Sequence, residues 1–407
     1  MRAVPPTLSQ LAPSLVEDPS LAEAGAERVA WARANMPVLA GLRDELERER
    51  PLAGRRLGMC LHVESKTAVL VEALRAGGAE VVWTGSPATT DDGVAAALAR
   101  EPGIVVYARK RDTHADHAEH VERVLGSDPD LLLDNGADLI AGAVASGGTR
   151  VAAATEETTS GRHRLLEELR GRVPFPVVVI NDSPIKLLFE NQHGIGPAVV
   201  DGFLRATNSL VAAQTFAVVG FGSCGRSLAR TLRALGATVL VVERDDLRAL
   251  EAAFEGFRVT TLERALAQAD VTATVTGRPG ILGREELLAV RDGAMLANVG
   301  HFPEIDVPAL EELAAAARRL APHVTAYELP NGRTVRLLAR GEMLNLSAAT
   351  GHQIQIMDLG FALQAHALRL LAREPERFEP GYQPVPAEID RAVAAAALRT
   401  LSTVERD

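Results

Sequence analysis

The chain has 407 residues, 47% of them hydrophobic and 24% charged, which is typical of a soluble globular protein large enough for two or three domains. A formal net charge of −10 argues against general nucleic-acid binding, although a local phosphate site stays possible. No apolar run is long enough for a membrane span, and the N-terminus lacks the apolar core of a signal peptide. With only two cysteines, Cys60 and Cys224, we expect a cytoplasmic protein without disulfides.

Short apolar runs alternate with helical stretches rich in Ala, Leu and Arg, and they do so in two series. This alternation predicts βαβ units and therefore parallel sheets. The strands expected in the first series are 57–61, 80–83, 104–107, 131–133 and 177–180. Those expected in the second series are 216–219, 238–242, 271–275 and 294–297. The fold class is therefore α/β, with two Rossmann-like, doubly wound parallel-sheet domains joined by a hinge.

The clearest motif is TFAVVGFGSCGRSLARTLRALGATVLVVERDD. An apolar strand leads into Gly220, Gly222 and Gly225, a helical pattern follows, and a second strand ends at Glu243. The glycines permit a tight turn and let the backbone approach a pyrophosphate at the helix N-terminus. Because Glu243 would accept hydrogen bonds from ribose hydroxyls and repel a 2′-phosphate, the motif predicts NAD rather than NADP. The alternative is a Gly-rich turn without a ligand.

Five further motifs occur in an order that resembles the S-adenosylhomocysteine hydrolase family over about residues 36–399. They are CLHVESKTAVLVEALRAGGAEVVW, TEETTSGRHRL, NDSPIKLLFEN, GHFPEIDV and LNLSAATGHQIQIMDLGFALQ. The resemblance implies a substrate-binding α/β domain at 1–190, an NAD-binding Rossmann domain at 191–350, and a helical segment at 351–407 that packs back on the first domain. It also implies a small purine nucleoside as substrate, no nucleic-acid or membrane partner, and a homo-oligomer, either dimer or tetramer.

The family's chemistry is a redox-neutral cycle in which NAD is a recycled catalyst. The nucleoside 3′-hydroxyl is oxidised to a ketone, the 4′ proton is removed, the 5′ substituent leaves, water adds, and the ketone is reduced again. By resemblance, Lys186 assists the oxidation and the 4′ proton transfer, for which it must be partly neutral. The other residues of the expected catalytic group are His62, Asn135, Glu190, Asn191 and His301.

The resemblance also assigns binding residues. The substrate contacts that it implies are Glu64, Lys66, Thr67, Glu157, His352, Met357 and Phe361. The NAD contacts that it implies, in addition to the glycines and Glu243, are Thr158, Thr159, Ser160, Asn191, Ser223, Cys224, Thr276, Asn298 and Asn345. Any one of these side chains, taken alone, is more often a solvated or paired surface residue, and only the family pattern favours the functional interpretation.

Three histidines in RKRDTHADHAEHVERVL, namely His114, His117 and His120, are spaced like metal ligands. The charge density of the stretch is more typical of a solvated helix, so we predict no metal site there.

Four features depart from the family pattern. Asn135 stands where the family has a catalytic aspartate, and an amide cannot titrate. Lys66, in the loop expected at the base, can only donate hydrogen bonds, so either Glu64 contacts the base or the base differs. The stretch Thr90-Asp91-Asp92 replaces the usual Thr-Gln-Asp, and the end STVERD lacks the family's Lys- and Tyr-containing tail.

These departures favour a repurposed enzyme. The leading hypothesis is a nucleoside dehydratase of nucleoside-antibiotic biosynthesis, of the type that converts angustmycin C to angustmycin A. One alternative is a hydrolase of S-adenosylhomocysteine or S-inosylhomocysteine, since Lys66 could donate to a purine O6. A second alternative, from another class, is an inactive NAD-binding regulator, against which the retained Lys186, His62 and His301 argue.

Overall fold

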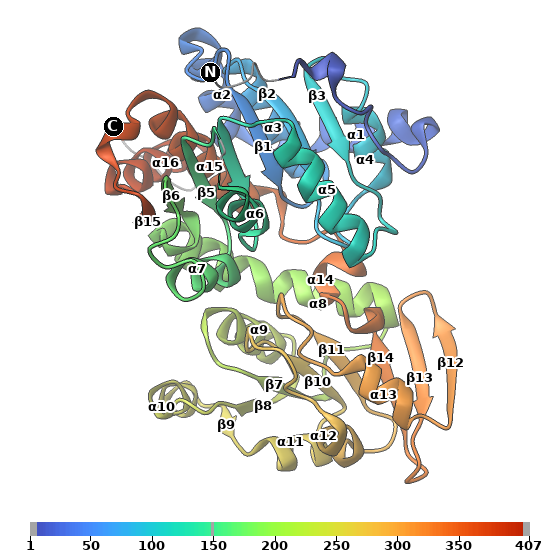
Figure 1. Ribbon diagram of the computed structural model, residues 1–407. Helices are drawn as coiled ribbons and strands as arrows, with labels where there is room; N and C mark the ends of the chain where they lie inside the picture. The colour runs from blue at the N-terminus through green and yellow to red at the C-terminus, as the bar shows by residue number, and fades with distance from the viewer. Residues whose placement is uncertain (1–5, 148–149, 402–407) are drawn as a thin grey trace. The chain divides into compact units, whose positions relative to one another are not determined.

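The computed structural model describes residues 6–147 and 150–401, and the chain forms two compact units (Figure 1). Unit 1 combines two separate segments, Met1–Leu187 and Ile354–Asp407, whereas unit 2 is the continuous segment Leu188–Gln353. Each unit is built on one sheet covered by helices.

The sheet of unit 1 is parallel throughout and has the strand order β15-β6-β5-β4-β1-β2-β3. The strands are β1 (Arg56–Cys60), β2 (Glu80–Thr84), β3 (Ile104–Tyr107), β4 (Leu131–Asp134), β5 (Ala153–Glu156), β6 (Pro176–Val179) and β15 (Gly381–Pro384). The chain proceeds from β1 to β3 in one direction and from β4 to β6 in the other, so the order reverses between β1 and β4.

Successive residues of these strands face two different cores, because side chains alternate across a strand. Leu57 and Met59 of β1 enter one core, and Cys60 enters the other. The first core is covered by α1 (Ala22–Ala34), α2 (Pro37–Glu49), α3 (Ser65–Ala76), α4 (Asp92–Leu98), α15 (Ile354–Arg373) and α16 (Ala387–Thr400). The second is covered by α5 (His114–Gly126), α6 (Asp138–Ser146) and α7 (Thr159–Leu166).

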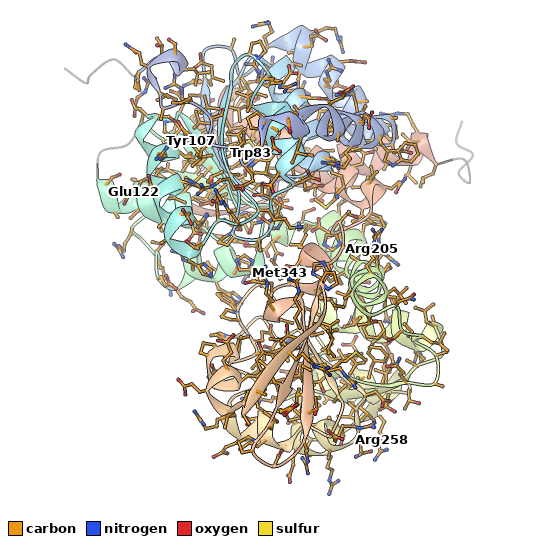
Figure 2. All side chains as sticks on the ribbon, turned by 90° about the vertical axis from the view of Figure 1, so that its right-hand side faces the viewer. Trp83, Tyr107, Glu122, Arg205, Arg258 and Met343 are labelled. Atoms are coloured by element: carbon orange, nitrogen blue, oxygen red, sulfur yellow. The ribbon has the colours of Figure 1, made fainter. Side chains whose placement is uncertain are left out.

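Trp83 is a large side chain of the first core (Figure 2). It is fully buried, and its indole N–H donates to the Leu61 carbonyl oxygen at 2.8 Å. The C-terminal segment completes the same unit, since α15 contacts β5 and β15 pairs with β6 (Figure 1).

The sheet of unit 2 is mixed and has the order β12-β13-β14-β11-β10-β7-β8-β9. Its strands are β7 (Thr215–Val219), β8 (Thr238–Val242), β9 (Arg258–Val259), β10 (Val271–Thr274), β11 (Met295–Asn298), β12 (Ala316–Ala321), β13 (Val324–Glu328) and β14 (Thr334–Leu338). Strand β13 is antiparallel to both of its neighbours, and the remaining pairs are parallel. In this sheet the order reverses between β7 and β10.

Helices cover both faces of the second sheet as well. One core is lined by α8 (Ile195–Thr207), α9 (Ser223–Ala234), α10 (Asp246–Phe254) and α14 (Leu344–Ser347). The other is lined by α11 (Leu262–Gln268), α12 (Arg284–Ala289) and α13 (Val307–Leu313). A π-helix, η4 (Lys186–Gly194), precedes α8.

The α/β class and the two Rossmann-like sheets are confirmed. The sequence did not reveal β5, β9, β15 or the antiparallel ribbon of β12, β13 and β14, so the second sheet is mixed rather than purely parallel. Among the described residues, no helix is both long enough and apolar enough to cross a membrane.

Candidate active site

The polar residues of unit 1 gather at the carboxyl ends of its central strands. His62 follows β1, Asn135 follows β4, Glu157 follows β5, and Asn181 follows β6. Strands β1 and β4 flank the point where the strand order reverses. Open parallel sheets usually bind their ligands in the crevice at that point, so the topology makes this edge the candidate site of unit 1.

Two buried carboxylates shape the loop that carries Asn135. Glu156 accepts hydrogen bonds from the backbone N–H groups of Gly136 and Ala137 at 3.0 and 2.9 Å. Asp134 accepts from the N–H groups of Asn135 and Ile140 at 2.9 and 2.8 Å. These bonds stabilise the left-handed backbone at Gly136 and Ala137, where φ is 91° and 61°.

Burial raises the pKa of both carboxyls, and each is raised further by the charge of a neighbouring acid. The pKa of Asp134 rises to about 7, with Asp138 as the second cause. The pKa of Glu156 rises to about 8, with Asp134 as the second cause. Both residues lie beneath the loop that they stabilise, and no sequence pattern had predicted a role for either of them.

Asn135 lies beside His62. The Asn135 Nδ2 atom is 3.5 Å from His62 Nε2, and the Asn135 side chain is buried. Within the described residues, Asn135 Oδ1 has no hydrogen-bond partner. The structure therefore places an amide, which cannot take or give a proton at neutral pH, next to the imidazole.

Lys186 is held in a buried polar trio. Its Nζ donates to Glu157 Oε1, and the side-chain amide of Gln364 on α15 donates to Glu157 Oε2. All three side chains are buried: 5% of Lys186, 4% of Glu157 and none of Gln364 is exposed. Buried charges persist when they are paired and hydrogen-bonded, and Gln364 supplies the second partner that the Glu157 carboxylate needs.

Glu64, which is partly buried, and the buried Lys66 form an ion pair at the start of α3. Glu64 accepts from the backbone N–H groups of Lys66 and Thr67 at 3.1 and 3.0 Å and from the Thr67 hydroxyl at 3.0 Å. Its Oε2 atom also lies 2.7 Å from Lys66 Nζ, and Lys66 is only 5% exposed. Glu64 is therefore an N-cap that holds the helix start, and the ammonium of Lys66 is the donor group of this loop.

The hydroxyl run Thr158, Thr159 and Ser160 is used locally in unit 1. Thr158 caps α7 by accepting from Gly161 N–H at 3.0 Å, and its hydroxyl donates to Glu156 at 2.7 Å. Thr158 and Ser160 hydroxyls lie 2.9 Å apart, and the Thr159 hydroxyl donates to Asn181 Oδ1 at 3.1 Å. The NAD contacts expected of these residues stay predictions.

In unit 2, the Gly-rich turn joins β7 to α9, as the motif predicted. Gly220 has φ of +106°, which favours glycine. A Cβ added at Gly225 would lie 2.0 Å from the Gly220 carbonyl oxygen, so close packing of helix and strand requires glycine there. A Cβ added at Gly222 would meet only Arg248 Nη1 at 3.9 Å, so the turn is open on that side.

Glu243 follows β8 and is oriented by three backbone N–H groups. It accepts from Phe221 at 2.7 Å, Arg244 at 2.7 Å and Asp245 at 3.0 Å. These bonds tie the acidic residue to the Gly-rich turn. An ionised carboxylate has about four lone-pair sites, so it retains capacity for a ribose hydroxyl.

The other expected NAD residues follow the next strands of the sheet. Thr276 follows β10 and bonds Glu304 Oε2 through both its N–H and its hydroxyl, each at 2.9 Å. Asn298 ends β11 and donates to the Phe302 carbonyl at 3.0 Å. Asn345 of α14 is buried, and within the described residues its Oδ1 atom has no hydrogen-bond partner. An open glycine turn, an oriented acid and an unsatisfied amide oxygen fit a bound dinucleotide.

The π-helix η4 carries two of the expected catalytic residues. Glu190 is buried, and its Oε1 atom lies 3.6 Å from His352 Nε2 within unit 2. Asn191 is partly buried on the same helix. Single π-helical turns are frequent at functional sites. His301 follows β11 and stacks edge-on with Phe302 at 5.8 Å between ring centroids.

The remaining expected residues lie in unit 1. Phe361 is 1% exposed in the core beneath α15, and Met357 packs against that core. The histidines of α5 are not all solvated, contrary to expectation: His114 is exposed, but His117 and His120 are buried. They are buried because each has a polar partner, Asp138 for His117 and Asp112 for His120.

Comparison with known proteins gives two family matches. Residues 191–351 match the NAD-binding domain of S-adenosyl-L-homocysteine hydrolase, and residues 14–149 match S-adenosyl-L-homocysteine hydrolase. A protein of Methanopyrus kandleri named S-inosyl-L-homocysteine hydrolase is 46% identical over 95% of this chain and 92% of its own length. Adenosylhomocysteinases of Aquifex aeolicus and Archaeoglobus fulgidus are 42% and 44% identical, over 95% and 93% of this chain and 94% of each relative.

Among solved structures, a dipicolinate synthase chain from Bacillus halodurans has a TM-score of 0.46 and 15% identity. The likeness covers 80% of this chain and 100% of that one.

Proposed function

Because the chain belongs to the S-adenosyl-L-homocysteine hydrolase family of NAD-dependent enzymes, we propose that it removes water from a purine nucleoside by transient oxidation of a ribose hydroxyl. The product would carry an exocyclic double bond, as in the conversion of angustmycin C to angustmycin A, and would belong to nucleoside-antibiotic biosynthesis. The observation that supports this proposal is the amide of Asn135 at 3.5 Å from His62.

The oxidation half of the reaction rests on residues that the chain retains. NAD would be held by the Gly220–Gly225 turn, Glu243 and Asn345, and when bound it supplies the reversible two-electron oxidant for the hydroxyl. The hydroxyl proton lost in the oxidation would pass through Lys186 to solvent and return when the ketone is reduced. Lys186 in its neutral form would then accept the proton from the carbon next to the new carbonyl. Glu157 and Gln364 would fix the direction of the Lys186 amine, since both belong to the same buried trio.

The elimination half requires one proton for the departing oxygen. Protonated His62 would give that proton, so that the nucleoside loses one water in total and the ribose hydroxyl is restored at the end. Adding water to the intermediate requires the opposite: a base must take a proton from the attacking water. A carboxylate at position 135 could share that work with His62, whereas Asn135 cannot.

Asn135 therefore changes how the unsaturated ketone intermediate partitions. Addition of water slows when position 135 carries no proton-transfer group to assist His62. Reduction of the ketone involves neither His62 nor Asn135. A general acid or base typically accelerates a step by about 100- to 10,000-fold. Losing one such group can therefore make reduction of the intermediate faster than addition of water. The alkene then becomes the main product even though elimination itself is also slower.

The test is the identity of the nucleoside product. Protein loaded with NAD is incubated with hydroxymethyl purine nucleosides, including a psicofuranosyl purine. The products are separated, and their masses are measured by mass spectrometry. The proposal expects a product lighter than its substrate by one water. If every substrate is recovered unchanged while S-adenosylhomocysteine or S-inosylhomocysteine gives a saturated nucleoside and a free thiol, the dehydratase proposal is wrong.

A second candidate, hydrolysis of an S-nucleosylhomocysteine with a 6-oxopurine base, is favoured by the Glu64–Lys66 pair. Glu64 is the N-cap of α3 and is also paired with Lys66, and the ammonium of Lys66 is the member of this pair that can donate hydrogen bonds to a base. An ammonium can donate to a 6-oxo group but cannot accept from a 6-amino group. The Methanopyrus kandleri relative is named for an inosyl substrate, which supports the same preference.

Paired substrates test this second candidate. Thiol release from S-inosylhomocysteine and S-adenosylhomocysteine is compared for the wild type and for Lys66→Gln, which is one atom shorter, removes the charge and adds a hydrogen-bond acceptor. The candidate predicts faster release from the inosyl compound and a smaller difference in the variant. Equal rates with both compounds in the wild type would count against a 6-oxopurine preference.

We also propose that the protein is a homo-oligomer and is cytoplasmic. The family resemblance supports the first, and two cysteines that form no disulfide within the described residues support a reducing compartment. Light scattering coupled to size exclusion measures the assembly, and a mass equal to one chain would contradict it.

A further inference from the structure

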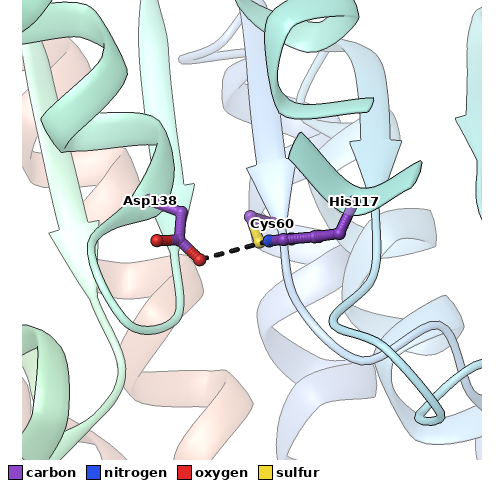
Figure 3. A group of neighbouring side chains, drawn as sticks. All are labelled: Cys60, His117 and Asp138. Atoms are coloured by element: carbon purple, nitrogen blue, oxygen red, sulfur yellow. Dashed lines mark hydrogen bonds and ion pairs between the residues drawn. The ribbon is translucent and has the colours of Figure 1, made fainter. Parts of the chain in front are cut away.

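Three side chains of types that bind metals meet on the opposite face of the unit 1 sheet from α15 (Figure 3). Cys60 ends β1, His117 lies on α5, and Asp138 begins α6. Their ligating atoms lie within 4.8 Å of one another. Figure 3 shows Asp138 and His117 on opposite sides of Cys60, with a ring nitrogen of His117 directed at the Asp138 carboxylate.

The imidazole of His117 is oriented as in many metal sites. Its Nδ1 atom lies 2.9 Å from the Gly85 carbonyl oxygen, which can only accept, so Nδ1 carries a proton. The opposite atom, Nε2, lies 3.1 Å from Asp138 Oδ2. In a neutral imidazole of this tautomer, two lone pairs would face each other, so the geometry requires a cation between them, either a proton or a metal ion. Metal-bound histidines usually donate their other N–H to a carbonyl or a carboxylate.

The surroundings of this cluster are acidic. The pKa of the Cys60 thiol is raised by burial and then by Asp134, Asp138 and Glu156. Burial alone would lower the pKa of His117, but its hydrogen bond to Asp138 and the charge of that carboxylate outweigh burial and raise it. Arg164 is the cation paired with Asp138, and its Nη1 bonds Oδ1 at 2.6 Å, which leaves Oδ2 for another partner.

We propose that Cys60 Sγ, His117 Nε2 and Asp138 Oδ2 form a binding site for one divalent transition-metal ion of the zinc class. The thiolate and imidazole select zinc, cobalt or copper over magnesium or calcium, which prefer oxygen ligands alone. Binding releases the thiol proton and the proton between His117 and Asp138. A water molecule completes the tetrahedron, since the Asp138 side chain is 40% exposed.

The required movement is small. Zinc bonds of about 2.0–2.3 Å place tetrahedral ligand atoms roughly 3.3–3.6 Å apart. The His117–Asp138 distance of 3.1 Å is already close to this range. No two of the ligating atoms are more than 4.8 Å apart, so about 1 Å of adjustment is enough. A bound ion would link β1, α5 and α6. It would lie near His62 and Asn135, because Cys60 is close to His62 in the sequence and Asp138 is close to Asn135.

Cobalt(II) titration tests the site in the full-length protein. Protein dialysed against a chelator is titrated with cobalt, and zinc binding is measured separately by elemental analysis after gel filtration. The expected results are tetrahedral cobalt absorption with a thiolate charge-transfer band, one equivalent of zinc per chain, and tighter binding at higher pH because protons are released. Absence of the charge-transfer band, or zinc below a tenth of an equivalent, would overturn the proposal.

Variants separate this site from incidental binding. Asp138→Asn and His117→Ala should each weaken zinc binding by more than about 10-fold, the lower end of what loss of even an outer-shell partner costs. His114→Ala, an exposed neighbour on α5, and Cys224→Ser, the other cysteine, are matched controls and should leave zinc binding unchanged. If Asp138→Asn folds and binds zinc as tightly as the wild type, or if either control variant loses the ion, the assignment is wrong.

Discussion

At the scale of single residues, the proposed dehydration assigns to Asn135 the choice between reduction of the unsaturated intermediate and addition of water to it. Asn135 lies 3.5 Å from His62 and offers the imidazole an amide in place of an acid. We expect Asn135→Asp to restore a proton-transfer group and increase the share of water-added nucleoside by at least about 10-fold, below the full range for such groups. The reaction is run in water labelled with heavy oxygen, because water addition otherwise only regenerates a hydroxymethyl substrate, and mass spectrometry of the labelled nucleoside and of the alkene measures this share.

The control for that change is Asn135→Ser, which also removes the amide but supplies no acid. It should lower turnover without raising the water-added share. If both variants raise the share of water-added nucleoside equally, the increase comes from the space opened around His62 and not from the acid. The role proposed for Asn135 would then be wrong.

A second residue-scale prediction concerns pH. The folded protein keeps protons on Asp134 and Glu156 up to pH values of about 7 and 8, whereas the unfolded chain loses them near the ordinary values of 3.8 and 4.5. The folded state therefore binds more protons in this window, so stability is greatest at its acid end and falls as pH rises toward 8. Each retained proton contributes a slope of about 1.4 kcal/mol per pH unit.

Melting temperatures between pH 5 and pH 9 should show this decline in the wild type. Glu156→Gln cannot titrate and should have a shallower slope, even though its overall stability is lower. Glu167→Gln, at an exposed position on the same segment, should keep the wild-type slope. A wild-type melting temperature that rises across this range would contradict the assignment of protonated buried carboxyls.

At the scale of elements, the turn between β7 and α9 contains one glycine that is needed for packing and another that we expect to be needed for NAD binding. A Cβ at Gly225 would lie 2.0 Å from the Gly220 oxygen, so Gly225→Ala should shift the backbone and cost roughly 1–3 kcal/mol of unfolding free energy. A Cβ at Gly222 has open space, so Gly222→Ala should keep the wild-type melting temperature but bind NAD more weakly. Calorimetric titration with NAD and thermal melts distinguish the two; equal melting temperatures for both variants would refute the packing argument.

The same elements show how far the sequence predicts the fold. Strands with continuous apolar runs, such as β1, β4 and β7, were recognisable because both of their faces are buried. Strand β12 reads AARRLA, and Ala, Arg and Leu are strong helix formers; its antiparallel pairing with β13 overrides that local preference. Strand β5 is short and lacks large apolar residues, and the equally short β15 has only Tyr382, so no continuous apolar run marks either of them.

The site was predictable where local motifs carry it and unpredictable where distant residues meet. The Gly-rich turn and Glu243 follow from spacing alone. Gln364 completes the Lys186–Glu157 trio across 207 positions of the chain, and His117 meets Asp138 from a different helix. Such pairings are set by how the strands are ordered in the sheet, which spacing along the sequence does not reveal.

At the scale of the whole molecule, the two units differ in how the chain builds them. Unit 2 is one continuous segment with its own cores, whereas unit 1 needs α15, α16 and β15 from the C-terminal segment to cover its sheet. We expect residues 188–353 expressed alone to melt cooperatively and to be stabilised by NAD. Residues 1–187 alone should aggregate, since the core face normally covered by α15 would be exposed. A fragment 188–353 that is unfolded in circular dichroism would contradict this division.

The proposed dehydration requires that the ketone of the unsaturated intermediate is reduced before water adds to its double bond. The most direct measurement is turnover of a hydroxymethyl purine nucleoside by NAD-loaded protein in water labelled with heavy oxygen, followed by mass spectrometry of the products. If reduction comes first, the product is unlabelled and has lost one water. A saturated nucleoside that carries the heavy oxygen, with no alkene at any time, would show that water adds first and would contradict the proposed dehydration.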